Sequence, residues 1–203
     1  MLTPPIGGGD DHGDTMRDTR GELLLEAEAL IRRHGYSGFS YADLALAVGI
    51  RKASIHHHFP TKENLAAALV AAYDERYDAE IDRITSETRD TIERVAAYGQ
   101  LYLQGVEQGL GCLCAVLAME LDNLPDRLRI EIVGFFGKHI LWLEAILREG
   151  LANETVRSDI DPAAHARMII ATLEGALMME RVMAGPAGFR SALGALTDSL
   201  RER

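Results

Sequence analysis

Apolar residues recur three or four positions apart along most of this chain, which is the spacing of one face of an α-helix. A first amphipathic helix is predicted over residues 17–34, and Gly35 follows as its C-cap. Its apolar residues are Leu23, Leu24, Ala27, Leu30 and Ile31. Longer helices are predicted over residues 62–83, 86–108, 125–150, 161–184 and 187–200, with a short one over 112–121. Because Ala and Leu are abundant and proline is sparse, we expect an all-α fold.

Two further short helices are predicted in the segment FSYADLALAVGIRKASIHHHFPTKENL, residues 39–65. Ser40 is a good N-cap with Asp43 three residues later, and Gly49 breaks the helix that follows. A second short helix spans residues 51–59, after which Thr61 caps the next one. This brings the expected total to about nine helices. Two short helices around a glycine turn form a helix-turn-helix, which places its second helix in the major groove of DNA.

The stretch GIRKASIHHHFPTKENL resembles the recognition-helix region of TetR/AcrR family transcriptional regulators. It shares with them the aromatic or His pair before Phe, then Pro or Ser, then Lys-Glu, although many members carry Tyr where this chain has His56. The resemblance covers about residues 19–69. It implies a DNA-binding domain over 16–64 and a ligand-binding and dimerisation domain over 65–203. The segment 1–15 is expected to be a disordered tail, because it contains Pro4-Pro5, Gly7-Gly8-Gly9 and polar residues.

The second helix of this motif carries the side chains that we expect to read DNA. Arg51 and Lys52 stand at its start, where they can reach phosphates or the acceptor edges of guanine. Ile55 and Phe59 are four residues apart and are expected to face the interior. The candidate DNA-binding residues, including phosphate contacts from the flanking helices, are Ser40, Tyr41, Arg51, Lys52, Ser54, His56, His57 and Lys62.

Three consecutive histidines raise the alternative of a small helical metal-dependent enzyme that uses them with Cys112 and acidic residues. Successive helical residues point about 100° apart, so His56, His57 and His58 do not converge on one ion. No nucleophile–base or ligand spacing supports catalysis either. We therefore expect a protein that is not an enzyme and has no metal, catalytic residue or cofactor.

Net charge is −10 over 203 residues, which is unusual for a DNA-binding protein. Residues 17–62 nevertheless carry seven cations and five anions, so the acidity lies outside the predicted reading domain. The chain has no apolar run of about 18 residues and no signal peptide, which predicts a cytoplasmic protein without a membrane partner. Two cysteines do not make a disulfide framework.

The last two predicted helices carry much apolar surface, which favours a homodimer through a four-helix bundle. The alternative is that these residues only close the core of the monomer. A dimer places two reading helices one DNA turn apart, so we expect a palindromic operator in double-stranded DNA. The residues are Met168, Ile169, Leu173, Leu177, Val182, Met183, Leu193, Leu196 and Leu200.

An effector would need a pocket, and aromatic and Met side chains suit adaptable apolar cavities. The candidates are Tyr98, Tyr102, Met119, Phe135, Phe136, His139, Trp142, Glu174 and Met178, each of which has ordinary core packing as its alternative. Cys112 is added because it begins a short helix, whose N-terminus lowers the pKa of a thiol.

The segment GCLCAVLAMEL is similar to a branch of the TetR family in which some members sense electrophiles or oxidants through the cysteine after Gly. The expected function is a ligand-responsive homodimeric repressor that a small molecule of unknown identity releases from its operator. The alternatives are a repressor that senses oxidants or electrophiles through Cys112, an activator, and a regulator with no small ligand. For Cys112 itself the alternative is a buried inert thiol.

Overall fold

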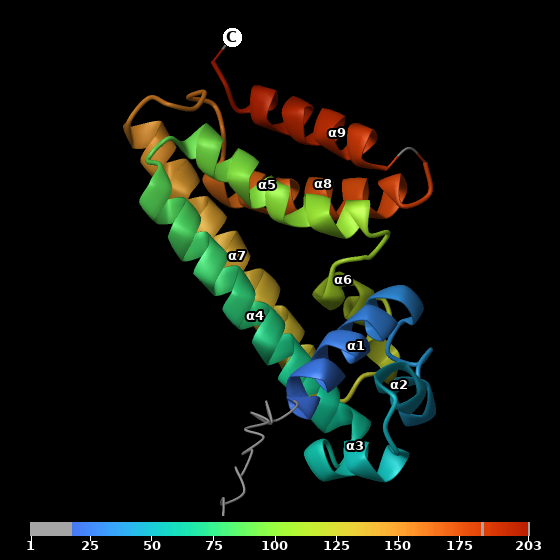
Figure 1. The fold of residues 1–203 in the computed structure, drawn as a ribbon. Coiled ribbons are helices and arrows are strands. Elements are labelled where there is room, and N and C mark those ends of the chain that lie inside the picture. Colours follow the sequence, from blue (N-terminus) through green and yellow to red (C-terminus); the bar gives the residue numbers. More distant parts are fainter. Residues whose placement is uncertain (1–17, 184, 203) are drawn as a thin grey trace, which may run out of the picture.

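The computed structural model describes residues 18–183 and 185–202, so the predicted tail over 1–15 lies outside the described residues. Within those ranges the chain is all α-helical and has no strand, which confirms the predicted fold class (Figure 1). The helices are α1 (Thr19–His34), α2 (Tyr41–Val48), α3 (Lys52–His58), α4 (Lys62–Glu87), α5 (Thr91–Glu107), α6 (Leu113–Ala118), α7 (Asp126–Ala152), α8 (Pro162–Glu180) and α9 (Pro186–Ser199), with a 3₁₀ turn η1 (Leu121–Asn123) before α7.

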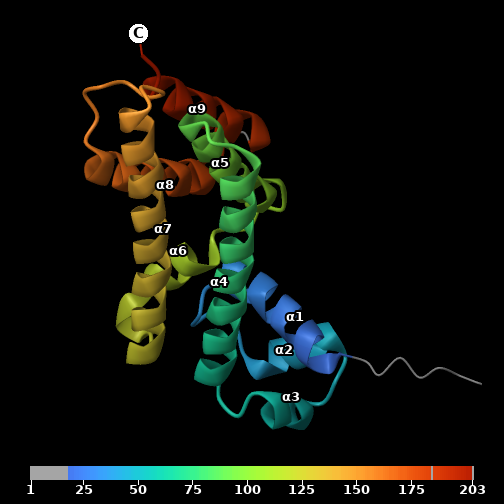
Figure 2. The same ribbon diagram turned by 90° about the vertical axis from the view of Figure 1, so that its left-hand side faces the viewer.

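Helices α1 to α3 form a small head at one end of the molecule, and the start of α4 closes its core (Figures 1 and 2). The capping box predicted at Ser40 and Asp43 begins α2, and Gly49 ends it in a left-handed conformation with φ 74°. This conformation suits glycine and allows the close turn into α3. Side chains from all four helices meet in the head core, including Leu23, Ile31, Leu44, Ile55, Phe59 and Leu65.

The body is built on α4 and α7, the two longest helices, which lie side by side (Figures 1 and 2). At the end remote from the head, α8 packs against α7, and α5 and α9 pack against α8. Helix α6 lies between head and body, where it contacts α1, α4 and α7. Because α4 starts in the head and runs the length of the body, it connects the two directly.

Helix boundaries differ from the prediction mainly between α4 and α5. Helix α4 continues to Glu87, and α5 begins only at Thr91. Asp90 is the N-cap of α5, and its side chain accepts a hydrogen bond from the Glu93 N–H. Asp90 is a stronger capping residue than Ser86, where the sequence pattern predicted the start, because its carboxylate also complements the helix dipole. At the other end, α8 finishes at Glu180 rather than near residue 184.

The apolar residues of the last two helices divide between two environments. Six of them are buried in the core of the monomer, namely Ile169, Leu173, Leu177, Leu193, Leu196 and Leu200. For these six, the alternative that they close the core of the monomer holds. By contrast, the exposed apolar side chains of α8 and the turn after it are Met168, Met178, Met179, Val182 and Met183. Among the described helices, none combines the length and apolar character needed to cross a bilayer.

Candidate DNA-binding surface and effector region

Helix α3 lies at the free end of the head (Figure 1), and its exposed side chains are mostly polar or basic. Ile55 and Phe59 turn inward and are buried, as predicted, which leaves the other face of this two-turn helix in solvent. Arg51 is its N-cap and Lys52 its first residue, and both side chains are exposed with no ion-pair partner among the described residues. Ser54 and His57 are exposed beside them. This surface offers two unpaired cations and two hydrogen-bonding side chains.

Tyr41 and Lys62, which are predicted to contact phosphates, each also make a contact within the head. The Tyr41 hydroxyl donates to the Phe59 carbonyl oxygen at 2.8 Å, and its ring is buried. The Lys62 ammonium donates to the Phe39 carbonyl oxygen at 2.6 Å and lies 4.3 Å from the centre of the Phe39 ring. Burial lowers the pKa of Lys62. Both side chains therefore brace the head that carries α3.

Ser40 and His56 are exposed, but each also has a local structural role. The Ser40 hydroxyl accepts from the backbone N–H groups of Ala42 and Asp43 in the capping box. The Nδ1 atom of His56 lies 3.2 Å from the Pro60 carbonyl oxygen, where α3 ends. The described residues contain no group of three His, Cys, Asp or Glu side chains placed to hold a metal ion.

Several of the predicted effector residues meet in a buried polar centre of the body. The Tyr98 hydroxyl lies 2.9 Å from Nδ1 of His139 and 3.2 Å from the Tyr102 hydroxyl. The Tyr77 ring stacks on His139 with a centroid distance of 5.3 Å. His139 is fully buried, and its Nε2 atom has no hydrogen-bond partner. Burial lowers the pKa of His139 to about 4, so the imidazole is neutral at pH 7.

The remaining predicted effector residues are less uniformly placed. Phe136 and Trp142 are partly buried at the edge of the core, and the Trp142 indole donates to the Thr85 hydroxyl at 3.1 Å. Met119 and Met178 are 83% and 62% exposed, so neither side chain belongs to the buried polar centre.

Cys112 and Glu174 lie together in the body, and the expectation of a lowered thiol pKa is wrong. Cys112 is the N-cap of α6 as predicted, but this helix has six residues and the thiol is 3% exposed. Burial first, and then the nearby charge of Glu174, raises the pKa of Cys112. Desolvation thus outweighs the short helix, and the thiol is held in its unreactive form. Burial also raises the pKa of the Glu174 carboxyl, to about 7.

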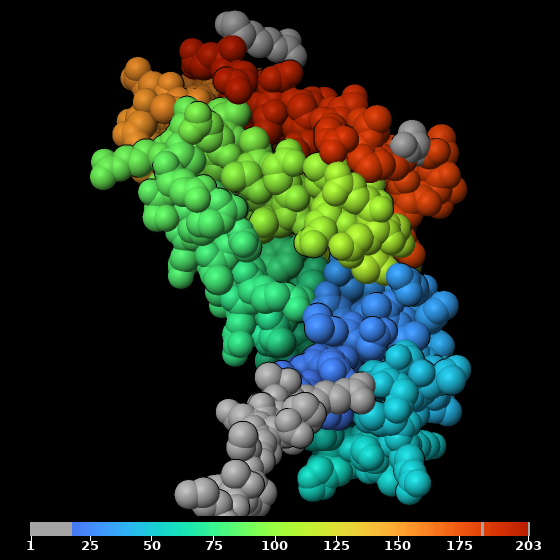
Figure 3. Space-filling model, in the orientation of Figure 1, coloured from blue at the N-terminus to red at the C-terminus, as the bar shows by residue number. Residues whose placement is uncertain are grey.

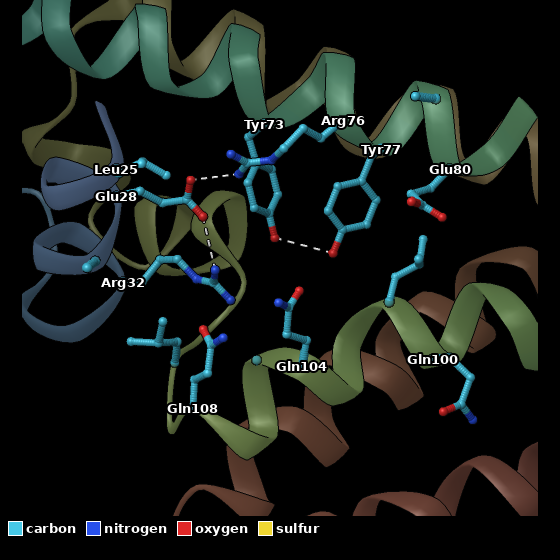
Figure 4. Close-up of a pocket in the computed structure, with 15 residues that line it drawn as sticks. Leu25, Glu28, Arg32, Tyr73, Arg76, Tyr77, Glu80, Gln100, Gln104 and Gln108 are labelled. Atoms are coloured by element: carbon cyan, nitrogen blue, oxygen red, sulfur yellow. Dashed lines mark hydrogen bonds and ion pairs between the residues drawn. The ribbon is translucent and has the colours of Figure 1, made fainter. Parts of the chain in front are cut away.

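An open groove of about 650 Å³ lies where α1, α4 and α5 meet (Figure 3). None of the predicted effector residues lines it. The signal for it in the sequence was the run of glutamines at four-residue spacing on α5, which places their amides on one helix face. Its lining includes Leu25, Glu28 and Arg32 from α1, Tyr73, Arg76, Tyr77 and Glu80 from α4, and Gln100, Leu101, Gln104, Gly105 and Gln108 from the end of α5 (Figure 4).

Arg32 joins the head to the body at one end of this groove. Its Nε atom donates to the Gly111 carbonyl oxygen at 2.6 Å, next to Cys112, and Nη1 lies 3.0 Å from the Glu28 carboxylate. The other oxygen of Glu28 accepts from Nη2 of Arg76 on α4 at 2.6 Å. A second head–body contact runs from the Ser37 N–H to the Glu120 carboxylate at 3.0 Å. Arg32 therefore anchors α1 to the residue that precedes Cys112.

Two family models match the chain. Residues 23–69 match the bacterial regulatory proteins of the tetR family, and residues 91–196 match the tetracyclin repressor-like C-terminal domain. The first match contains the whole of α2 and α3, and the second runs from the start of α5 into α9. Together they account for the head and most of the body.

Known proteins agree with these matches. The nucleoid occlusion factor SlmA of Vibrio atlanticus is 31% identical over 167 residues, which cover 80% of this chain and 84% of the relative. The HTH-type transcriptional repressor DhaR of a Mycobacterium species is 24% identical over 168 residues, 80% of this chain and 82% of that protein. A crystal structure of a TetR-family regulator from Agrobacterium tumefaciens superposes with a TM-score of 0.85 at 33% identity, covering 90% of this chain and 97% of that one. The chain therefore belongs to the TetR family, and it is a DNA-binding transcriptional regulator rather than an enzyme.

Proposed function

We propose that this regulator is a cytoplasmic, ligand-responsive, homodimeric repressor that binds a palindromic operator through α3 of each protomer. The observation that carries the proposal is the exposed, unpaired pair Arg51 and Lys52 at the start of α3. Cations that lack an internal partner lose no protein contact when they bind phosphate or guanine. The acidic remainder of the chain supports the same assignment, because it leaves the head as the region that can approach DNA.

A dimer through α8 and α9 is supported by the outer faces of these helices. Gly175 on α8 and Gly194 on α9 have open space where a side chain would begin. Met168 and Met178 are exposed on α8 near Gly175 in the sequence. Small residues permit close helix–helix approach, and exposed Met side chains adapt to a partner's surface. Two copies of this pair of helices would form a four-helix bundle.

The response to an effector is proposed to arise in the body and to reach α3 through α1 and α4. Support comes from the polar centre, where Glu174 and Cys112 lie close to the loop that Arg32 holds by the Gly111 carbonyl. An effector that rearranges this centre changes the position from which Arg32 anchors α1. The energy for the switch is the difference in effector affinity between the DNA-binding arrangement and the released one.

DNA binding is tested by fluorescence anisotropy with duplexes that flank the coding region, in the presence of non-specific competitor. The double variant Arg51→Ala/Lys52→Ala is expected to lose at least about tenfold in affinity, because each base or phosphate contact of this kind is worth about 1 kcal/mol or more. The matched control is Arg148→Ala/Arg190→Ala, which removes the same charge from exposed sites in the body. Equal losses in both variants contradict a reading role for α3. If the protein does not bind the flanking DNA, the next test is a selection of binding sequences from random duplexes. If that selection also yields no bound sequence, the proposal is overturned.

The dimer is tested by sedimentation equilibrium of Gly194→Glu. A charge placed in the middle of the proposed bundle should shift the protein toward monomer. Gly137→Glu on α7 is the matched control, since Gly137 is also a helical glycine with open space at its Cβ position. A Gly194→Glu protein that sediments as wild type places the interface elsewhere.

A further inference from the structure

The groove between α1, α4 and α5 concentrates hydrogen-bond donors around one space. Figure 4 shows the Arg32 guanidinium, the Tyr77 hydroxyl and the Gln104 amide facing this space from three different helices. Arg32 Nη2 approaches α5 closely, since a Cβ atom at Gly105 would lie 3.1 Å from it. This nitrogen has no acceptor among the described residues, and neither does the amide of Gln104. The Tyr77 hydroxyl accepts from Tyr73 at 3.3 Å, so its own hydrogen is free to donate.

The two carboxylates of the groove are already paired with arginines. Both oxygens of Glu28 bind guanidinium groups, one of Arg32 and one of Arg76. Glu80 accepts from Nε of Arg83 at 2.9 Å. Two arginines therefore share the Glu28 carboxylate, while Glu80 shares Arg83 with Glu87. The two cations and two carboxylates of the lining cancel in formal charge, so an anionic ligand is favoured by the unsatisfied donors, and a guanidinium binds a carboxylate especially well.

Apolar and aromatic side chains form a further part of the groove lining. Leu25 is 65% exposed at its rim, and Leu101 on α5 is partly buried along its wall. The Tyr73 ring is flanked by the two guanidinium groups, with Arg76 at 5.3 Å and Arg32 at 6.0 Å from its centroid. The volume of about 650 Å³ is in the range of small-molecule sites. A ligand with a flat ring and one acidic group matches this lining, because the acidic group can face the hydrogen-bond donors and the ring can face the apolar and aromatic side chains.

We propose that this groove is a binding site for small aromatic carboxylates. The carboxylate accepts from Arg32 Nη2, the Tyr77 hydroxyl and the Gln104 amide, and the ring lies along Leu25, Leu101 and the tyrosines. This site is distinct from the buried polar centre, although Tyr77 separates the two and stacks on His139. The ligand bridges the head to the body, because its partners come from α1, α4 and α5. Binding does not depend on the proposed repressor function, and only the effect on operator affinity rests on it.

Isothermal titration calorimetry of the full chain tests the site with three probes, benzoate, phenylacetate and indole-3-acetate, each compared with its neutral amide. We expect at least one carboxylate to bind at one site per chain and its amide to bind about tenfold or more weakly, since a hydrogen bond to a charged group is lost. Gln104→Met should weaken the carboxylate by a similar factor.

The matched control is Gln100→Met, the same substitution one turn earlier on α5, where Figure 4 shows the side chain directed away from Arg32. Because Gln100 lines the groove outside the three proposed contacts, Gln100→Met should weaken the carboxylate less than Gln104→Met does. Saturable binding by none of the three carboxylates at millimolar concentration overturns the site. Equal binding of carboxylate and amide, or equal effects of the two Gln variants, also overturns it.

The operator assay separates this proposal from the repressor function. A carboxylate that binds in calorimetry and leaves operator affinity unchanged confirms the groove and contradicts its role in regulation. A protein that binds no operator at all contradicts the repressor function, while the calorimetric result still decides the groove.

Discussion

Replacing Glu174 by glutamine should remove most of a pH-dependent loss of stability. The carboxyl ionises near the ordinary glutamate pKa of 4.5 in the unfolded chain, whereas burial raises the pKa to about 7 in the folded protein. Between these values the folded state holds a proton that the unfolded state has released, so the free energy of unfolding falls as pH rises. A shift of about 2.5 units corresponds to about 3 kcal/mol at 1.36 kcal/mol per unit. Relative to wild type, Glu174→Gln should therefore gain up to about 3 kcal/mol between pH 5 and pH 8.

Urea denaturation at pH 5, 6, 7 and 8 measures this difference, with protein concentration held constant because a dimer gains stability by mass action. Glu75→Gln provides the control, since this glutamate is exposed on α4 and its loss should leave the pH profile parallel to that of wild type. Parallel profiles for Glu174→Gln as well would show that the carboxyl is solvated, and would remove the physical basis for a closed polar centre.

Three further results follow from single contacts. Arg94→Met should lower the free energy of unfolding, measured by urea denaturation, by about 2 kcal/mol. The reason is that the buried guanidinium binds Glu149 at 2.7 Å and the carbonyl oxygens of Thr85 and Thr88. A decrease below about 0.5 kcal/mol contradicts this prediction. Ser40→Ala should cost about 1 kcal/mol by the same assay, through loss of the capping box, and no change would show that Asp43 alone caps α2. Both buried thiols should react with an aromatic disulfide only as fast as the protein opens, so fast reaction of one thiol in the native protein would refute the inert state of Cys112.

Sequence patterns predicted the helix ends well where a single capping residue determines the end of the helix. Ser40, Gly49 and Thr61 each act through the backbone of their own turn, so capping preferences were enough to find the head. The boundary between α4 and α5 was less well defined, because residues 84–92 contain several polar residues that can cap a helix. In the structure Asp90 caps α5 by accepting a hydrogen bond from the Glu93 N–H.

The site was harder to predict because its properties depend on burial and on residues distant in sequence. Lys62 is predicted to contact phosphate, and no local pattern indicates that its ammonium also donates to a carbonyl oxygen 23 residues away. The pKa of Cys112 was expected to fall at a helix N-terminus, and burial beside Glu174, which lies on α8, raises it instead. The groove is formed by α1, α4 and α5 together, so the glutamines of α5 gave only one of its walls.

The direction of any regulation through the groove follows from Arg32. Its Nη2 atom is open to a ligand while Nε and Nη1 remain bonded to Gly111 and Glu28, so a carboxylate can bind without breaking the contacts that hold α1. Such a ligand stabilises the present arrangement of head and body, because all three of its partners are already in place. It releases the protein from DNA only if this arrangement binds the operator more weakly than another one does. The effect of a bound carboxylate on operator affinity therefore identifies which arrangement of the head binds DNA.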